Sequence, residues 1–188
     1  MFFKKSKNID DKVVKKASME LAKGSAQAFH LLYHKYKNDV YRYCYRILND
    51  KNLADDVFQE TFIKVYENRE YFNGDNFKAW VITIARNTCY NYFRKKKDEV
   101  EFDDSYIGSV NDVNTDFALK DLLGKAIDSL PLKFREVIIL REYEDYSYQE
   151  IAEILDIDIS LVKVRIHRAR LLLKEKLEPL VKEIYESR

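Results

Sequence analysis

Glycine and proline are scarce in this chain, which has four glycines and two prolines among its 188 residues. A β-sandwich needs many such turn residues, so their scarcity argues against that class and favours helices. No apolar run approaches the roughly 18 residues that a membrane-spanning helix needs. The start, MFFKKSKNIDDK, has no long apolar segment and therefore is not a secretory signal. We expect no membrane insertion.

Cysteine and histidine are also rare. Cys44 and Cys89 are isolated and have no CxxC spacing, and the three histidines form no zinc-binding pattern. We therefore expect no metal site and no cofactor. A reducing cytoplasm is the simplest setting for two lone cysteines.

Charge is abundant but unevenly distributed. Lys and Arg exceed Asp and Glu by 9 in residues 1–97, whereas residues 98–121 carry a balance of −7 and residues 122–188 a balance of −1. This pattern predicts two structured ends joined by an acidic connector. We expect an all-α chain with a helical bundle over 1–97, a flexible acidic linker over 98–118 and a second helical domain over 119–188. The connector is also compatible with a plain solvated tether.

Helical periodicity dominates along the chain, and no alternating strand pattern is evident. Gly24 is suited to end the first helix, Ser25 to cap the second, and the NGD sequence at 73–75 predicts a turn. Pro131 should end the first helix after the connector. The predicted helices cover 11–23, 26–48, 53–70, 77–97, 119–130 and 133–142.

The segment SYQEIAEILDIDISLVKVRIHRARLLLKEKL predicts a helix-turn-helix. Ser147 and Glu150 form the S-x-x-E capping box of a short helix. A turn at 156–158 follows, and Asp158 or Ser160 caps a longer helix. An inward stripe is expected at Val162, Ile166 and Ala169, with Lys163, Arg165, Arg168 and Arg170 mostly outside it. Such cations can neutralise phosphates and reach base edges, although a solvated basic face would show the same pattern.

The stretch FKAWVITIARNTCYNYFRKKK, residues 77–97, separates into two faces at about 100° per residue. The face assigned to the core contains Val81, Ile82, Ala85, Cys89, Tyr92 and Phe93. The opposite face contains Trp80, Thr83, Ile84, Asn87, Tyr90, Asn91 and Arg94. Exposed rings, amides and cations together suit unstacked bases of single-stranded nucleic acid. Packing of Trp80 on a neighbouring helix is the alternative.

The third predicted helix carries an acidic stripe that ends in an apolar residue. Its members are Asp56, Gln59, Glu60 and Ile63 at positions i, i+3, i+4 and i+7. Paired carboxylates can bind a metal or exchange protons, but no histidine accompanies them in the sequence. A protein-docking surface is favoured, and a solvated face remains open.

At this point the sequence resembles the extracytoplasmic-function type of bacterial sigma factors. Four motifs occur in the order found in that family, and together they cover nearly all of residues 20–177 except the connector. They are AKGSAQAFHLLYHKY, LADDVFQETFIKVY, FKAWVITIARNTCYNYFRK and LPLKFREVIILREYEDYSYQEIAEILDIDISLVKVRIHRAR. The resemblance implies a promoter-specificity subunit that is not itself an enzyme.

The resemblance also implies partners and roles for individual residues. The partners are core RNA polymerase (its largest-subunit clamp helices and flap region), promoter DNA as duplex and melted strand, and an anti-sigma protein. Clamp-helix docking falls on Asp56, Gln59, Glu60, Phe62 and Ile63. Recognition and melting of the −10 element fall on Phe72, Asn73, Gly74, Asp75, Asn76, Phe77, Trp80, Asn87, Tyr90, Asn91, Arg94 and Lys95. Reading of the −35 element falls on Ser160, Leu161, Lys163, Val164, Arg165 and Arg168.

Several positions depart from the family pattern. Asn91 stands where many relatives have Asp, and Asp156 where many have Gly. Leu161 and Val164 replace hydroxyl residues, which leaves apolar groups that can meet thymine methyls.

Two other functions remain compatible with the residues. A stand-alone helix-turn-helix regulator, with an N-terminal sensor or dimerisation domain, would bind free duplex tightly. A metal-dependent nuclease would use Asp55, Asp56 and Glu60, although ligands on one helix do not converge on an ion.

Overall fold

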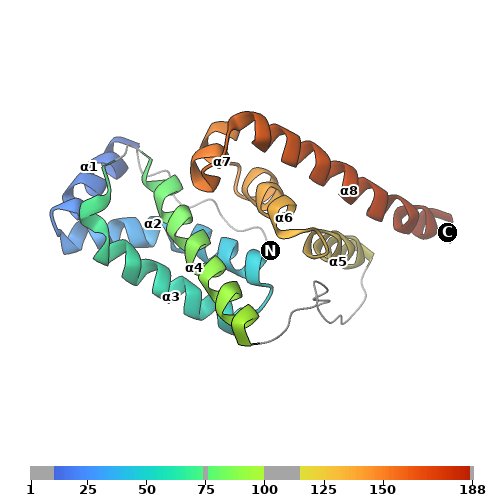
Figure 1. Cartoon of the computed structure of the whole chain (residues 1–188), viewed down its shortest axis with the longest axis horizontal. Helices are drawn as coiled ribbons and strands as arrows, with labels where there is room; N and C mark the ends of the chain where they lie inside the picture. Colours follow the sequence, from blue (N-terminus) through green and yellow to red (C-terminus); the bar gives the residue numbers. More distant parts are fainter. Residues whose placement is uncertain (1–10, 74–75, 100–114, 187–188) are drawn as a thin grey trace. The chain divides into compact units, whose positions relative to one another are not determined.

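The computed structural model describes residues 11–73, 76–99 and 115–186, and all regular structure within these ranges is helical (Figure 1). The chain divides into two compact units with the boundary between Lys96 and Lys97, and each unit is described by itself. The predicted all-α class is confirmed. Most of the acidic connector, residues 100–114, lies outside the described residues.

The N-terminal unit consists of four α-helices and one 3-10 turn. The Ser25 side chain accepts a hydrogen bond from the Ala28 backbone N–H and caps the second helix. Asn49 ends that helix in the left-handed region at φ 50°, and Asp50 caps the third helix by accepting from the Leu53 N–H at 3.1 Å. The elements are α1 (Asp11–Ala22), α2 (Ala26–Leu48), α3 (Lys51–Glu67), η1 (Arg69–Tyr71) and α4 (Phe77–Glu99).

Aromatic and aliphatic side chains hold these helices together. Tyr43 is completely buried on α2, and the Tyr36 ring lies 5.5 Å from the Phe77 ring at the start of α4. Lys64 on α3 donates to the Thr88 hydroxyl on α4 at 3.3 Å. Burying one large apolar side chain contributes about 1.5–3 kcal/mol, so this core fixes the orientation of α3 and α4.

The faces of α4 agree in part with the sequence prediction. Val81, Ile82, Ala85 and Cys89 are all buried. Tyr92 and Phe93 are only half-buried. The prediction of full burial was wrong for these two rings, because the core already closes one turn earlier, at Thr88 and Cys89.

The C-terminal unit contains α5 (Thr115–Asp128), α6 (Leu132–Ile138), η2 (Ile139–Tyr143), α7 (Tyr148–Leu155) and α8 (Ile159–Glu186). The prediction of one regular helix over 133–142 was wrong, because η2 is a π-helical turn in which the Glu144 N–H reaches back to the Ile139 carbonyl. Residues 137–140 are four consecutive buried positions. A helix enclosed on all sides has no solvent face, so a period of 3.6 in the sequence could not locate its end.

The helix-turn-helix is formed as predicted. Ser147 and Glu150 make the complete capping box, with the Glu150 carboxylate accepting from the Ser147 N–H at 2.8 Å. Asp156 ends α7 in the left-handed region at φ 52°. Helix α8 begins at Ile159, which places Asp158 at its N-cap position. Val162, Ile166 and Ala169 are buried, as the stripe predicted.

Among the described helices, none combines the length and apolar character that a membrane span requires.

Candidate nucleic-acid and protein interfaces

One row of polar side chains runs along the outer face of α4. Asn87, Asn91 and Arg94 are all exposed and are spaced at i, i+4 and i+7. Because these positions repeat on one side of a helix, two amides and a guanidinium share a single stripe. Lys95 continues α4, but its side chain lies outside the described part. This stripe can donate to phosphates and hydrogen-bond base edges without any rearrangement of the core.

Trp80 lies at the start of this face, inside an aromatic cluster. Its ring is 5.1 Å from Phe72 and 5.5 Å from Phe77, and it is half-buried. The sequence left open whether Trp80 is exposed to bases or packs on a neighbouring helix. Its ring instead packs against Phe77 at the start of its own helix and against Phe72 at the end of η1. Part of the indole therefore stays available to a ligand, while the packed part is held in place.

Two rings assigned to −10 recognition, Phe72 and Phe77, pack against Trp80. Phe77 is 1% exposed and Phe72 is 9% exposed. Both rings are covered in this conformation, and their part in −10 recognition stays a prediction. They fill the core at the start of α4, where an apolar ring is stabilised by burial.

The 73–76 segment contains a helix cap that the sequence analysis missed. Asn73 is exposed, whereas the Asn76 side chain accepts a hydrogen bond from the Ala79 N–H at 3.0 Å. Asn76 thus occupies the N-cap position of α4, a role that asparagine favours. The signal was present, because Asn76 directly precedes the first apolar residue of the helix. Gly74 and Asp75 lie outside the described residues.

Arg86 is a further residue of this surface that the sequence analysis missed. Its guanidinium lies 4.6 Å from the centre of the Tyr90 ring, and Tyr90 is half-buried. A cation held over a ring fixes the ring's orientation. The spacing of four residues on one helix was the available signal.

The predicted docking row on α3 is exposed, with one exception. Asp56, Gln59 and Glu60 are exposed, and Ile63 is 57% exposed. Phe62 is only 5% exposed, and its assignment to the docking segment stays a prediction. It points from α3 toward α2, where the centre of its ring lies 4.8 Å from that of Tyr33.

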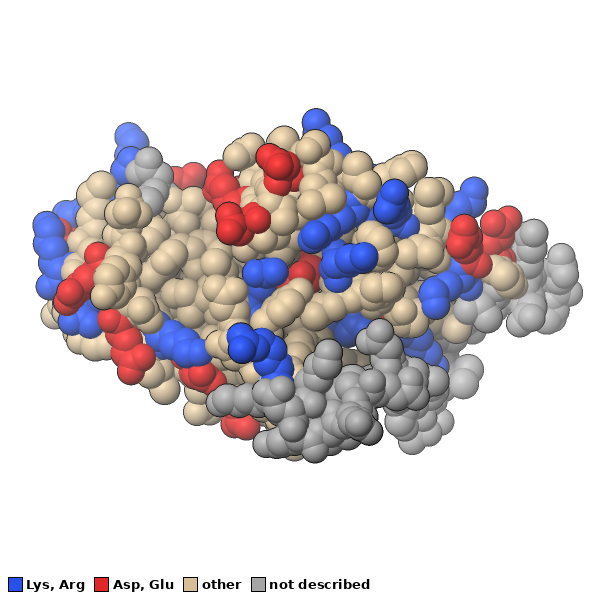
Figure 2. All heavy atoms as spheres, in the orientation of Figure 1, with Lys and Arg blue, Asp and Glu red and all other residues tan. Residues whose placement is uncertain are grey.

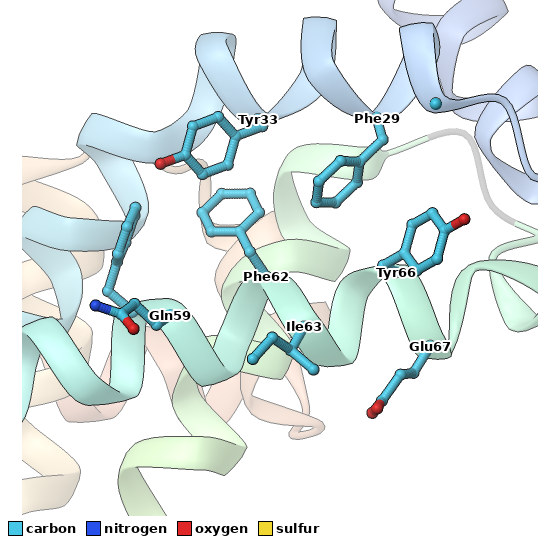
Figure 3. Close-up of a pocket in the computed structure, with 9 residues that line it drawn as sticks. Phe29, Tyr33, Gln59, Phe62, Ile63, Tyr66 and Glu67 are labelled. Carbon is cyan, nitrogen blue, oxygen red and sulfur yellow. The ribbon is translucent and has the colours of Figure 1, made fainter.

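An aromatic groove runs beside this row, between α2 and α3. It has a volume of about 690 Å³ and includes Phe29 and Tyr33 from α2 and Phe62 and Tyr66 from α3 (Figure 3). Figure 3 shows Phe62 directed toward Phe29 and Tyr33, whereas Ile63 and Glu67 point away from α2. Phe29 and Tyr66 lie 5.4 Å apart edge to face. The sequence contained this feature as aromatics at i, i+4 spacing, but only Phe62 was assigned a role.

The outer face of α8 combines cations with apolar side chains. Ser160, Lys163 and Arg168 are exposed, and Arg165 is half-buried. Leu161 and Val164 are 39% and 45% exposed. Because the N-terminal turns of the second helix in a helix-turn-helix reach base edges, all six predicted residues lie on the part of the unit suited to a major groove.

Not every predicted cation on α8 is available. Arg170 forms an ion pair with Glu142, with 2.6 Å between Nη2 and Oε1, and this hydrogen bond raises the pKa of the guanidinium. Figure 2 shows both signs of charge on the visible face, with no large area of one sign.

Two of the three acidic residues required by the nuclease alternative have other partners. Glu60 pairs with Lys64 at 2.6 Å. Asp55 interacts with Tyr41, and burial followed by the Asp55 carboxylate raises the pKa of that phenol. Within residues 11–73, 76–99 and 115–186, no three His, Cys, Asp or Glu side chains are grouped so that they could hold a metal ion.

Known proteins similar to this chain match both units. Residues 32–99 match the family described as Sigma-70 region 2, and residues 120–173 match Sigma-70, region 4. The ECF RNA polymerase sigma factor SigW of Bacillus subtilis is 33% identical over 184 residues, which cover 89% of this chain and 98% of SigW. The ECF RNA polymerase sigma-E factor of Haemophilus influenzae is 34% identical over 174 residues, which cover 84% and 92%.

Solved structures agree with these matches. The sigma factor RpoE of Bartonella quintana, crystallised with the anti-sigma factor NepR, has a TM-score of 0.70 and 30% identity, over 81% of this chain and 98% of RpoE. CnrH, solved with the cytosolic domain of CnrY, has the same TM-score at 21% identity, over 89% and 98%, and supports the fold alone. A stand-alone regulator is not favoured, because the N-terminal unit matches region 2 instead of a sensor. The chain therefore belongs to the ECF family of RNA polymerase sigma factors, the alternative initiation factors of bacterial transcription.

Proposed function

We propose that three helix faces of this sigma factor divide the work of initiation among them. The observation that carries the proposal is that α3, α4 and α8 each present a different chemistry to solvent. Helix α3 presents an acidic and apolar row beside an aromatic groove, and α4 presents a row of amides with a partly exposed indole. Helix α8 presents a row of cations and apolar groups. These three surfaces suit three different partners. Catalysis belongs to the polymerase.

The α3 row and the adjoining groove provide the polymerase contact. Ile63 offers a large exposed apolar group, and the exposed Asp56 carboxylate can meet a cation on a partner helix. Glu60 can do the same by exchanging its ion pair with Lys64. An apolar centre with a polar rim is typical of stable protein interfaces. The clamp helices of the largest subunit are the proposed partner.

The α4 face holds the opened strand of the −10 element. The half-exposed Trp80 ring can stack on a base, and Asn87, Asn91 and Arg94 can bind the edges and backbone of the nucleotides beyond it. Residues 73–75 precede this helix in the sequence, and on this proposal they receive a flipped base.

The α8 face reads the −35 element as duplex. Lys163 and Arg168 are exposed on the N-terminal half of the helix and can bind phosphates or guanine edges. The proposal also includes a protein that regulates this chain. Since the related RpoE was crystallised with an anti-sigma factor, we include an anti-sigma protein among the cytoplasmic partners.

The primary experiment is transcription by purified bacterial core polymerase on a genomic promoter library, with and without this chain. Specific start sites that appear only with the chain support the proposal and supply the promoter sequence. If no start sites appear and the chain also fails to bind the core enzyme, the proposal fails.

Variants of single faces separate the three roles. Ile63→Glu should abolish core binding, because a charge replaces an apolar contact that is 57% exposed in the unbound chain. Met19→Glu on α1 is the matched control, since Met19 is 53% exposed and has no proposed role. The double variant Asn87→Ala/Asn91→Ala should retain core binding and lose strand opening, measured by permanganate reactivity of unpaired thymines.

A further inference from the structure

Two apolar side chains are exposed where α8 would enter a DNA groove. Leu161 and Val164 are 39% and 45% exposed, whereas Val162 and Ile166, on the other side of the helix, are at most 1% exposed. At about 100° per residue, Val164 points almost directly away from the buried stripe, and Leu161 lies one turn before it. The core of the unit is therefore complete without these two groups.

Single exposed apolar residues need no explanation, but the surroundings of this pair identify an occupant. Lys163 and Arg168 are exposed beside them, and Ser160 precedes them on the first turn. Cations around the pair favour a polyanion over an apolar protein surface. Its place at the start of the second helix of a helix-turn-helix is the place that contacts base edges in duplex DNA.

The chemistry of the pair restricts which base it can read. In the major groove, guanine, cytosine and adenine present only hydrogen-bonding groups, whereas thymine also presents a C5 methyl. Leucine and valine have no donor or acceptor, so pressing them against a polar edge would leave that edge unsatisfied. A thymine methyl is the one groove feature that gains from such contact.

We propose that Val164 and Leu161 read thymine methyl groups, so that the upstream duplex element of this sigma factor's promoters carries thymines at the positions these side chains face. This inference rests on the proposed function of α8. It adds a base preference that the cations alone do not define, because phosphate contacts carry no sequence information.

The test compares thymine with deoxyuridine, which lacks only the C5 methyl and pairs in the same way. Promoters selected by the holoenzyme are resynthesised with deoxyuridine at each upstream thymine in turn. Loss of one buried methyl corresponds to about 0.8 kcal/mol, or about a four-fold weaker holoenzyme binding. We expect this loss at one or two upstream positions, and no change when deoxyuridine replaces thymines in the spacer.

Protein variants connect the effect to the two side chains. Val164→Ala and Leu161→Ala should each reduce the thymine-to-deoxyuridine ratio toward one at a single position. Leu171→Ala should leave the ratio unchanged and serves as the matched control, because Leu171 is also an exposed apolar residue of α8, at 47%, without a proposed contact to DNA. Since both target residues are exposed, the variants should fold, which circular dichroism checks.

Three results would overturn the inference, and they differ in what else they affect. Equal binding of thymine and deoxyuridine promoters, with specific initiation intact, rejects methyl reading alone. A thymine preference that both alanine variants retain shows that other residues read the methyl and also rejects it. Absence of any specific initiation with core polymerase rejects the proposed function together with this inference.

Discussion

Trp80 is the residue whose replacement is most informative, because part of its ring is held by the protein and part is exposed. Alanine at this position removes ring contacts at 5.1 Å to Phe72 and 5.5 Å to Phe77. Each aromatic pair contributes about 0.5–1.5 kcal/mol beyond area burial, so the two contribute about 1–3 kcal/mol. A fully buried Trp or Phe changed to alanine costs about 3–5 kcal/mol. For this half-buried ring we expect the free energy of unfolding to fall by about 2–3 kcal/mol.

The exposed part of the ring predicts a separate effect on strand opening. Stacking of one base on an aromatic side chain contributes about 1–3 kcal/mol. Trp80→Ala should therefore reduce open-complex formation by about 5- to 150-fold. Core polymerase binding should stay unchanged, since the α3 row and its groove do not include this residue.

The assay keeps the two effects apart. Unfolding in urea gives the stability loss, and permanganate reactivity of promoter thymines gives strand opening at a temperature where the variant is folded. Tyr45→Ala is the control, because Tyr45 is also an exposed aromatic, at 45%, without a proposed contact to DNA. Trp80 is the only tryptophan of the chain, so quenching of its fluorescence in the wild-type open complex reports stacking directly. Normal opening by folded Trp80→Ala, together with unquenched wild-type fluorescence, would refute the reasoning.

Three further predictions concern stability. Burial, followed by the charges of Asp39 and Asp11, raises the pKa of Tyr36 to about 12. Since the folded state holds this proton more tightly, this contribution to stability is present below about pH 10 and lost as the pH rises through about 12. Tyr36→Phe should remove that alkaline loss, which is up to about 3 kcal/mol, in urea unfolding measured against pH; an identical pH dependence in both proteins would contradict this. Asp156→Ala should cost about 1 kcal/mol in thermal unfolding, whereas Asp156→Gly should not, because only glycine adopts φ 52° without strain; equal effects would exclude backbone strain. Ser147→Ala should cost about 1 kcal/mol by removing the cap of α7, and an unchanged midpoint in urea would show that water replaces the cap.

The parts of the fold that the sequence predicted well are those where a local signal acts alone. Ser147 and Glu150 predicted the start of α7, because a capping box needs only four residues. Asn87 and Asn91 were correctly placed on the exposed side of α4, since helical periodicity decides that question. These features depend on no contact distant in the sequence.

Sequence reasoning could not give the burial of a ring where tertiary contacts decide it. Phe77 was grouped with the −10 residues, and its ring packs against Tyr36 and Phe72. Phe62 was grouped with the docking residues, and its ring packs against Tyr33 and Phe29 of α2. In both cases helical periodicity indicates on which side of its helix a ring lies. Only the tertiary structure shows whether another part of the chain covers that side.

The buried pair of rings formed by Phe72 and Phe77 has a consequence for how promoter choice can change. Phe72 and Phe77 are buried with their ring centres 5.5 Å apart, and Asn76 caps α4 just before Phe77. These contacts belong to Phe72, Asn76 and Phe77. On the proposed function, we expect substitutions at the positions between Phe72 and Asn76 to change −10 recognition while these three contacts stay in place. A library varied at these positions alone is then a route to sigma factors with new promoters on an unchanged scaffold.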